Sequence, residues 1–190
     1  MTQLLSYELC AGAGGQALGL SNAGFAHVGL VDNDAAACAT LKQNRPDWNV
    51  QHNSLDAISL TDKPKLDLIA GGLPCPPFSI AGKQLGKEDE RDLFPEAIRL
   101  IGEADPKAIM IENVRGLLDR RFDDYRTHIL GELVQLGYIG EFKLFNAAEY
   151  GVSQQRWRTV LVAMKPRYWI HYNWPDGEQK KTKDHREPVV

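Results

Sequence analysis

The chain has 190 residues, of which 43% are hydrophobic and 25% charged, and its formal net charge is −3. This length suits one domain with its own core, and the composition excludes disordered, collagen-like and disulfide-stapled proteins. The charge argues against a strongly basic nucleic-acid-binding protein. The excess acid lies entirely in residues 1–75, which carry four Lys or Arg and seven Asp or Glu. With no long apolar run, no leader sequence and three cysteines, the sequence predicts a cytoplasmic protein without a membrane span or disulfide framework.

Predicted strands and helices alternate along the chain. Residues 4–10 predict a strand that breaks at a glycine-rich turn, and residues 15–23 predict a helix with Leu18, Leu20 and Ala23 on its buried side. Further strands are expected at 28–31, 66–70, 108–111, 138–145 and 157–164, and further helices at 35–43, 92–104 and 122–136. This alternation predicts an α/β fold, in which a mostly parallel sheet has helices on both faces and binds ligands beyond the carboxyl ends of its strands.

The glycine-rich turn, residues 12–15, joins the first strand to the first helix. Glycines allow the backbone to approach a ligand closely, and the start of a helix points N–H groups at an anionic group. Asp32 ends the next predicted strand about 20 residues later, where a carboxylate can bind ribose hydroxyls. This pair fits a dinucleotide and an adenosyl ligand equally well, and a tight turn without a ligand is the alternative.

Cys75 lies between Pro74 and Pro76 after a buried-type strand. The prolines fix the backbone and remove N–H donors, and the loop position predicts the exposure that a nucleophile needs. Cys38 is interpreted instead as a small buried hydrophobic residue. Because no Cys or His near Cys75 has the spacing of metal ligands, no metal site is predicted.

Three charged residues stand beside late strands. Glu112 follows an apolar strand, where a carboxylate needs a partner or a task, and the alternative is that it caps a helix or pairs with an arginine. Arg156 and Arg158 are two residues apart on an extended segment, so their side chains point the same way and can hold a carboxylate or a phosphate. A charged edge strand is the alternative there.

In this order and spacing, the four segments resemble the DNA cytosine-5 methyltransferases, which use S-adenosylmethionine. The resemblance rests on residues 8–15, Pro74-Cys75, Glu112-Asn113-Val114 and Gln154-x-Arg156-x-Arg158. It implies a Rossmann-like S-adenosylmethionine-dependent methyltransferase fold over residues 1–175. It also implies a polar tail over 176–190, where the family's target-recognition region would begin. The chain would then be a subunit of a split enzyme, a shortened chain or a reduced relic. The expected partner is double-stranded DNA in the bacterial or phage nucleoid, with or without a second subunit that carries the recognition region.

The resemblance also assigns residue roles. Cys75 would add to C6 of a flipped-out cytosine, and Glu112 would hold N3 and the exocyclic amine. Arg158 would orient the ring, and Arg156 would support its loop. The cofactor would contact Cys10, Ala11, Gly12, Gly14, Gly15, Asp32, Asn33, Ser54, Leu55 and Pro74. DNA would contact a catalytic loop through Ser79, Lys83, Gln84, Lys87 and Arg91.

Three positions depart from the family pattern. Cys10 replaces a phenylalanine that stacks on adenine, Asn33 stands where an aromatic residue is common, and Ser54 replaces the aspartate that meets the adenine amino group. These departures predict weaker or differently shaped adenine recognition. Two other functions stay open: an RNA (tRNA) cytosine-5 methyltransferase of the same fold, and a non-catalytic remnant that binds cofactor or DNA. The presence of Cys75, Glu112 and Arg158 together argues against a non-catalytic remnant.

Overall fold

The structure, a computed structural model, describes residues 3–74 and 92–177. In these residues seven strands form one sheet, in the order β3-β2-β1-β4-β5-β7-β6. The strands are β1 (Leu4–Leu9), β2 (Phe25–Asp32), β3 (Val50–His52), β4 (Leu68–Gly72), β5 (Ala108–Val114), β6 (Ile139–Asn146) and β7 (Trp157–Met164). Neighbouring strands are parallel except at β7, which is antiparallel to both β5 and β6. The predicted mostly parallel sheet is confirmed.

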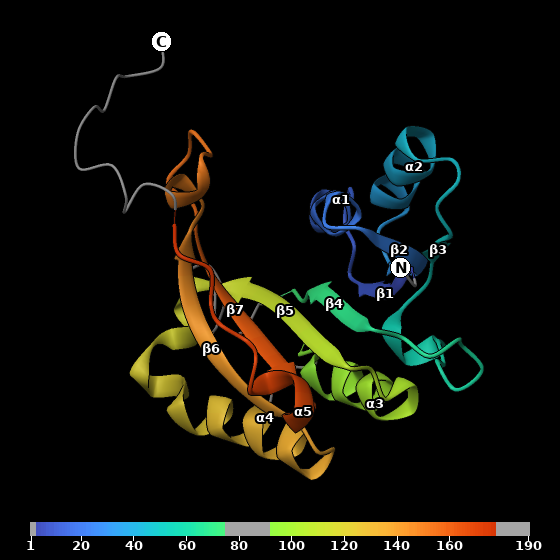
Figure 1. Cartoon of the computed structure of the whole chain (residues 1–190). Coiled ribbons are helices and arrows are strands. Elements are labelled where there is room, and N and C mark those ends of the chain that lie inside the picture. Colours follow the sequence, from blue (N-terminus) through green and yellow to red (C-terminus); the bar gives the residue numbers. More distant parts are fainter. Residues whose placement is uncertain (1–2, 75–91, 178–190) are drawn as a thin grey trace.

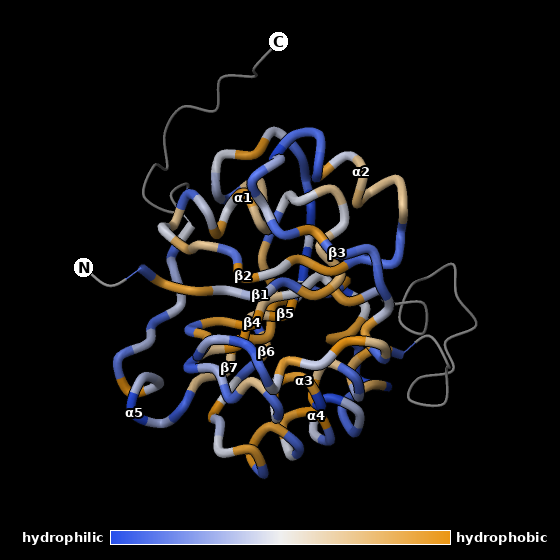
Figure 2. Tube along the Cα trace, turned by 90° about the vertical axis from the view of Figure 1, so that its right-hand side faces the viewer, coloured by the Kyte–Doolittle hydropathy of each residue, from blue (hydrophilic) through white to orange (hydrophobic). Residues whose placement is uncertain are grey.

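Helices cover both faces of this sheet, as predicted. The α-helices are α1 (Gly15–Asn22), α2 (Ala35–Asn44), α3 (Phe94–Ala104), α4 (Asp123–Gln135) and the short α5 (Pro166–Trp169). Short 3-10 helices are η1 (Leu55–Ala57), η3 (Arg115–Leu118), η4 (Arg120–Phe122) and η5 (Ala147–Tyr150). Figure 1 shows α1 and α2 beside β1–β3, and α3 and α4 beside β4–β7; Figure 2 shows the sheet between these two helical layers. None of the helices in the described residues is both long and apolar enough to span a bilayer.

The main core lies between the sheet and the layer formed by α3 and α4, where large side chains such as Tyr7 and Ile109 are fully buried. On the other face, α1 buries Ala17 and Leu20. The prediction for α1 was wrong at Leu18, which is 41% exposed, and at Ala23, which is also exposed. Residues 17 and 20 are three apart and share one helix face, whereas residue 18 is turned about 100° away from residue 17.

Strand boundaries differ from the prediction where pairing partners decide them. β5 continues three residues beyond residue 111, because β7 pairs with it as far as Val114. Glu112 therefore lies inside this strand. β3, which has only three residues, was not predicted because such a short run shows no clear alternation of apolar and polar side chains.

The register brings the ends of several strands to one edge of the sheet. Leu9 pairs with Gly71, and Gly72 pairs with Glu112, so β1, β4 and β5 end nearly level. Because β7 runs in the opposite direction, its beginning reaches this same edge, where Arg158 pairs with Val114. All of the sequence-predicted site residues within the described part of the chain come from this edge or from the loops beside it.

Candidate active site

The glycine-rich turn adopts a backbone that other residues rarely tolerate. Gly12 has φ 54° and Gly14 has φ 89°, both in the left-handed region. A Cβ on Gly14 would lie 2.4 Å from Cδ2 of Leu41 in α2, so this position leaves room only for glycine. Cys10, just before the turn, also has a positive φ of 51°. Backbone of this kind is strained for a residue with a side chain, and such strain concentrates at functional sites.

Asp32 fastens the turn to the end of β2. One of its carboxylate oxygens accepts a hydrogen bond from the N–H of Gly12 at 2.7 Å, and the other accepts one from the N–H of Asp34 at 2.8 Å. Each oxygen has a further lone pair that can accept from a ligand hydroxyl. The Asp32 carboxylate therefore holds the turn in place and can still accept hydrogen bonds from ribose hydroxyls.

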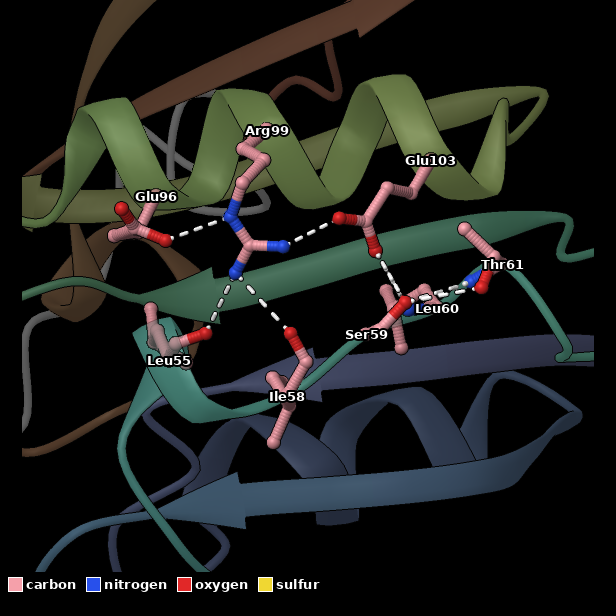
Figure 3. Close-up of polar contacts among 8 residues, drawn as sticks. All are labelled: Leu55, Ile58, Ser59, Leu60, Thr61, Glu96, Arg99 and Glu103. Atoms are coloured by element: carbon pink, nitrogen blue, oxygen red, sulfur yellow. Dashed lines mark hydrogen bonds and ion pairs between the residues drawn. The ribbon is translucent and has the colours of Figure 1, made fainter.

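The loop after β3 is held to α3 by a network around Arg99. Figure 3 shows the Arg99 guanidinium between Glu96 and Glu103, pointing from α3 toward the loop. Arg99 donates to the carbonyls of Leu55 at 2.8 Å and Ile58 at 3.2 Å. The Glu103 carboxylate in turn accepts from the backbone N–H of Leu60 at 2.8 Å. The network thus fixes the segment that carries the predicted adenine-side residues.

A cavity of about 460 Å³ opens beside the glycine-rich turn. Its wall comes from β1, the turn, α1, β4, β5 and β7. The lining residues are Glu8, Cys10, Ala11, Gly15, Gln16, Gly72, Met110, Glu112, Arg156 and Val160. Above Gly72 the side chains of two of them converge, because a Cβ built there would lie 3.6 Å from Oε2 of Glu112 and 3.9 Å from Oε1 of Gln16. The cavity therefore joins the turn to the predicted catalytic carboxylate.

Glu8 is a buried carboxylate without a partner. Its side chain belongs to β1 and is 0% exposed, and neither carboxylate oxygen has a hydrogen-bond partner among the described residues. Burial raises the pKa of Glu8 to about 8, and the backbone N–H of Ala17, which lies near it outside hydrogen-bonding geometry, opposes this rise. A carboxylate so placed is costly unless a cation or a proton joins it. Because Glu8 lines the cavity, a cationic group of a ligand can meet it there.

Glu112 has the partners that Glu8 lacks. Its Oε1 lies 2.6 Å from Nε of Arg158 and 3.9 Å from Nη2 of Arg156. The prediction that the two arginines point the same way is confirmed, and the carboxylate they hold is Glu112. Its side chain keeps 33% of its surface exposed, so the carboxylate can still receive a ligand.

Asn146 shapes the loop that delivers Arg156. This side chain is 5% exposed; its oxygen accepts from the N–H groups of Arg156 at 3.2 Å and Ala148 at 3.3 Å, and its nitrogen donates to Gln155 at 2.6 Å. The backbone N–H of Ala147 also donates to the carbonyl of Arg156 at 2.9 Å. One buried amide thus sets the path of the chain into β7.

The described cysteines are protected thiols. Burial raises the pKa of Cys10 to about 12, and the charge of Asp32 adds to the rise. Burial also raises the pKa of Cys38, which is 2% exposed, as the prediction of a packing role requires. A thiol with so high a pKa is a poor nucleophile at neutral pH.

The structure brings together part of the predicted site. Five predicted residues line the cavity: Cys10, Ala11, Gly15, Glu112 and Arg156. Four more lie next to this group. Arg158 is paired with Glu112, Gly12 donates to Asp32, and Gly14 directly precedes α1. Besides these four, the predicted residues in the described part of the chain that do not line the cavity are Asn33, Ser54, Leu55 and Pro74. The predicted residues outside the described part of the chain are Cys75, Ser79, Lys83, Gln84, Lys87 and Arg91.

Two polar cavity residues, Glu8 and Gln16, received no role in the sequence reasoning, although Glu8 belongs to the segment 8–15 on which the resemblance rests. The signal for Glu8 was present, because it is a carboxylate inside an apolar strand, the pattern that singled out Glu112. Gln16 opens a helix with a polar side chain, which is too common a pattern to single it out.

Comparison with known proteins decides the family. Residues 5–190 match the model of the C-5 cytosine-specific DNA methylases. The chain belongs to this family. Type II methyltransferase M.NgoMIV of Neisseria gonorrhoeae is 58% identical to this methylase chain over 182 residues, which cover 95% of the chain and 58% of that protein. Type II methyltransferase M.NaeI of Lentzea aerocolonigenes is 48% identical over 179 residues, covering 93% of the chain and 43% of that protein.

A solved structure of the same fold agrees. The crystal structure of a Spodoptera frugiperda DNMT2 mutant matches the methylase chain with a TM-score of 0.70 and 26% identity, over 85% of this chain and 50% of that one. The Rossmann-like methyltransferase fold expected from the sequence is thereby confirmed. The chain spans about half the length of the relatives it matches.

Proposed function

We propose that this chain forms the catalytic part of an enzyme that transfers a methyl group from S-adenosylmethionine to C5 of cytosine in DNA. The observation that carries the proposal is the shared cavity, in which Glu112, held by Arg158, faces the glycine-rich turn. A base on one side and a methyl donor on the other would meet there. Membership of the family supports the reaction, and the names of the type II relatives support DNA as the substrate.

The residues present fit the cofactor. S-adenosylmethionine supplies an electrophilic methyl group when it is bound. Glu8 would hold its ammonium group, because an unpaired buried carboxylate in the cavity gains most from a cation. Asp32 would hold the ribose hydroxyls, and the glycine-rich turn would lie against the methionine part. Ser54, Leu55 and Pro74 would border the adenine end, with Asn33 beside Asp32.

The chain's own groups would then activate the base. Glu112 would hold N3 and the exocyclic amine, while Arg158 keeps that carboxylate in place and Arg156 supports the loop. The Cys75 thiolate would add to C6, which makes C5 nucleophilic enough to accept the methyl group. Loss of the C5 proton and release of the thiolate would restore the ring. Because C5 is hidden in a duplex, the cytosine must be flipped out of the helix.

We propose that the target DNA sequence is recognised by a segment outside these 190 residues, since the relatives are about twice as long. Within this chain, Ser79, Lys83, Gln84, Lys87 and Arg91 would contact the DNA near the target base. The whole enzyme would act on nucleoid DNA in the cytoplasm of a bacterium.

Trapping on a modified base tests the proposal. The full-length enzyme that contains this chain is incubated with S-adenosylmethionine and duplex DNA carrying 5-fluorocytosine, from which the C5 fluorine cannot leave as a proton does, so the Cys75 adduct persists. We expect a covalent complex with wild-type protein and none with Cys75→Ser, while cofactor binding by calorimetry stays unchanged in that variant.

The control is Cys38→Ser, which removes a buried thiol to which the proposal assigns no role and should still be trapped. Trapping of Cys75→Ser at the wild-type level would overturn the mechanism. Trapping on tRNA carrying the same base, but not on DNA, would reassign the substrate to RNA. A cofactor-binding protein that is trapped on neither would be the non-catalytic remnant.

A further inference from the structure

A second cavity opens at the opposite edge of the sheet, where β5 begins and β7 ends. Its volume is about 400 Å³, and Pro106 and Pro166 form part of its wall. Its charged residues are Lys65, Asp105, Lys107, Lys165 and Arg167. They come from three separate parts of the chain: the loop before β4, the connection from α3 to β5, and the start of α5. The proposed chemistry of the first cavity uses none of them.

Two of the four cations are anchored by carboxylates. Nζ of Lys107 lies 2.5 Å from Oδ1 of Asp67, whose other oxygen accepts from the backbone N–H of Leu5 at 2.8 Å. Nζ of Lys165 lies 2.5 Å from Oδ1 of Asp105 and also donates to the carbonyl of Leu136 at 2.9 Å. Anchored side chains lose little further freedom when a ligand binds, so these two lysines are preorganised.

The other two cations have no such partner. Neither Lys65 nor Arg167 has a carboxylate within 4.0 Å in residues 3–74 and 92–177, and both side chains are exposed. Their charges nevertheless act on the anchored pairs. The pKa of Asp105 is lowered mainly by Lys165 and further by the charge of Lys65. The pKa of Lys107 is raised mainly by Asp67, and the charge of Arg167 opposes that rise.

We propose that this cavity binds a phosphate group of a small molecule, with Lys65 and Arg167 as its direct ligands. The two uncompensated positive charges match a phosphate dianion, and a guanidinium can donate two parallel hydrogen bonds to phosphate oxygens. An anion there also removes the unfavourable proximity of Arg167 and Lys107. Lys107 and Lys165 hold the surrounding positive field in place through their carboxylate partners. The inference does not depend on the proposed methyl transfer.

Calorimetric titration with inorganic phosphate, at an ionic strength held constant with chloride, tests the site. We expect saturable binding of one phosphate per chain. The double variant Lys65→Ala/Arg167→Ala should bind at least about tenfold more weakly, because the phosphate loses both of its direct charge-assisted hydrogen-bond donors. The matched control is Lys42→Ala/Lys63→Ala, which removes the same charge from exposed lysines outside the cavity and should keep the wild-type affinity.

Three results would overturn the proposal: no saturable phosphate binding by the wild-type protein, an equal loss in the control variant, or binding of duplex DNA without binding of inorganic phosphate. If the alanine double variant fails to fold, as judged by circular dichroism, Lys65→Arg/Arg167→Lys takes its place. That variant keeps both charges and should retain saturable binding, and loss of all binding in it would count equally against the site.

Discussion

Glu8 and Glu112 face one cavity, and the fold gives them opposite electrostatic surroundings. Arg158 keeps Glu112 paired, whereas Glu8 is fully buried and neither of its carboxylate oxygens has a hydrogen-bond partner among the described residues. Neighbouring carboxylates in different surroundings are a common way to divide roles within a site. We infer that Arg158 holds the Glu112 side chain in place for the base, whereas Glu8 carries a proton near neutral pH until a cation arrives.

Glu8→Gln should change stability in a pH-dependent way. The pKa of Glu8 is about 8 in the folded protein against an ordinary 4.5, so below pH 4.5 both folded and unfolded states are protonated and nothing is lost. Between about 4.5 and 8 the unfolded state ionises first, and the stability contribution falls as pH rises. The variant cannot ionise, so its Tm should exceed that of wild type at pH 8 by more than at pH 5.

The same variant should bind S-adenosylmethionine about tenfold more weakly, because a neutral amide replaces the charged acceptor. Calorimetry checks the affinity and thermal melts check the stability. A parallel pH profile for wild type and variant would show that Glu8 is not the group that titrates.

Arg158→Ala should lower methyl transfer while leaving cofactor affinity intact. Glu112 would keep only Arg156, whose Nη2 lies 3.9 Å away, so the carboxylate would lose its close partner and its fixed orientation. Loss of one preorganised group at a reacting centre costs about a hundredfold in rate. Arg158→Lys keeps the charge and should retain part of the rate. Rates measured with the full-length enzyme check this, and an unchanged rate in the alanine variant would contradict it.

At the scale of elements, α3 holds the loop after β3 in place. The Arg99 network reaches from this helix to the backbone of residues 55–60 (Figure 3). Carbonyl groups need no particular side chain to accept these hydrogen bonds. The network can therefore hold the loop in one path although Ser54 stands where the family pattern has an aspartate.

Arg99→Ala should weaken S-adenosylmethionine binding, since two carbonyl groups of the loop after β3 lose their hydrogen-bond donor and the loop becomes more mobile. Arg99 is partly exposed, so we expect about 1 kcal/mol, or roughly fivefold in affinity. Arg99→Lys keeps the charge beside Glu96 and Glu103 without the fork of donors, and should lie between the two. Calorimetry of wild type and both variants measures these affinities. Equal affinities would mean that the loop after β3 keeps its conformation without Arg99.

The sequence predicted those features that depend on local pattern. Alternation along an extended segment predicted that Arg156 and Arg158 point the same way, and the glycines at residues 12–15 predicted a sharp turn after the first strand. The sequence could not predict that Arg158 pairs with Glu112, because this contact depends on β7 lying beside β5 in the reverse direction. It also assigned no role to Glu8, because the burial of both carboxylate oxygens depends on tertiary packing and not on local pattern.

At the scale of the whole molecule, an exposed arginine lies beside the edge that carries the site. Arg115 follows β5 directly, and its guanidinium lies 5.5 Å from the ring centre of Trp157, the first residue of β7. Both side chains are exposed. A guanidinium stacked on an indole keeps its N–H edge free for phosphate oxygens. We infer that this pair contacts the DNA backbone beside the target base.

Arg115→Ala should weaken DNA binding by the full-length enzyme and reduce its salt dependence by about one unit of slope, because one phosphate contact is lost. Arg167→Ala removes a cation from the opposite edge and is the matched control, for which we expect no change in slope. Fluorescence anisotropy over a salt series measures both. Identical slopes for all three proteins would place Arg115 away from the DNA.

The reversed direction of β7 has a consequence for how such enzymes diversify. Because this strand begins at the site, Arg156 and Arg158 are delivered by a surface connection, residues 151–156, rather than by a buried crossover. Buried Asn146 anchors that connection at its base, so its outer residues are free to vary without disturbing the sheet. Substitutions at Val152 and Ser153, which leave the Asn146 partner Gln155 in place, are therefore a natural starting point for directed evolution of substrate choice in this scaffold.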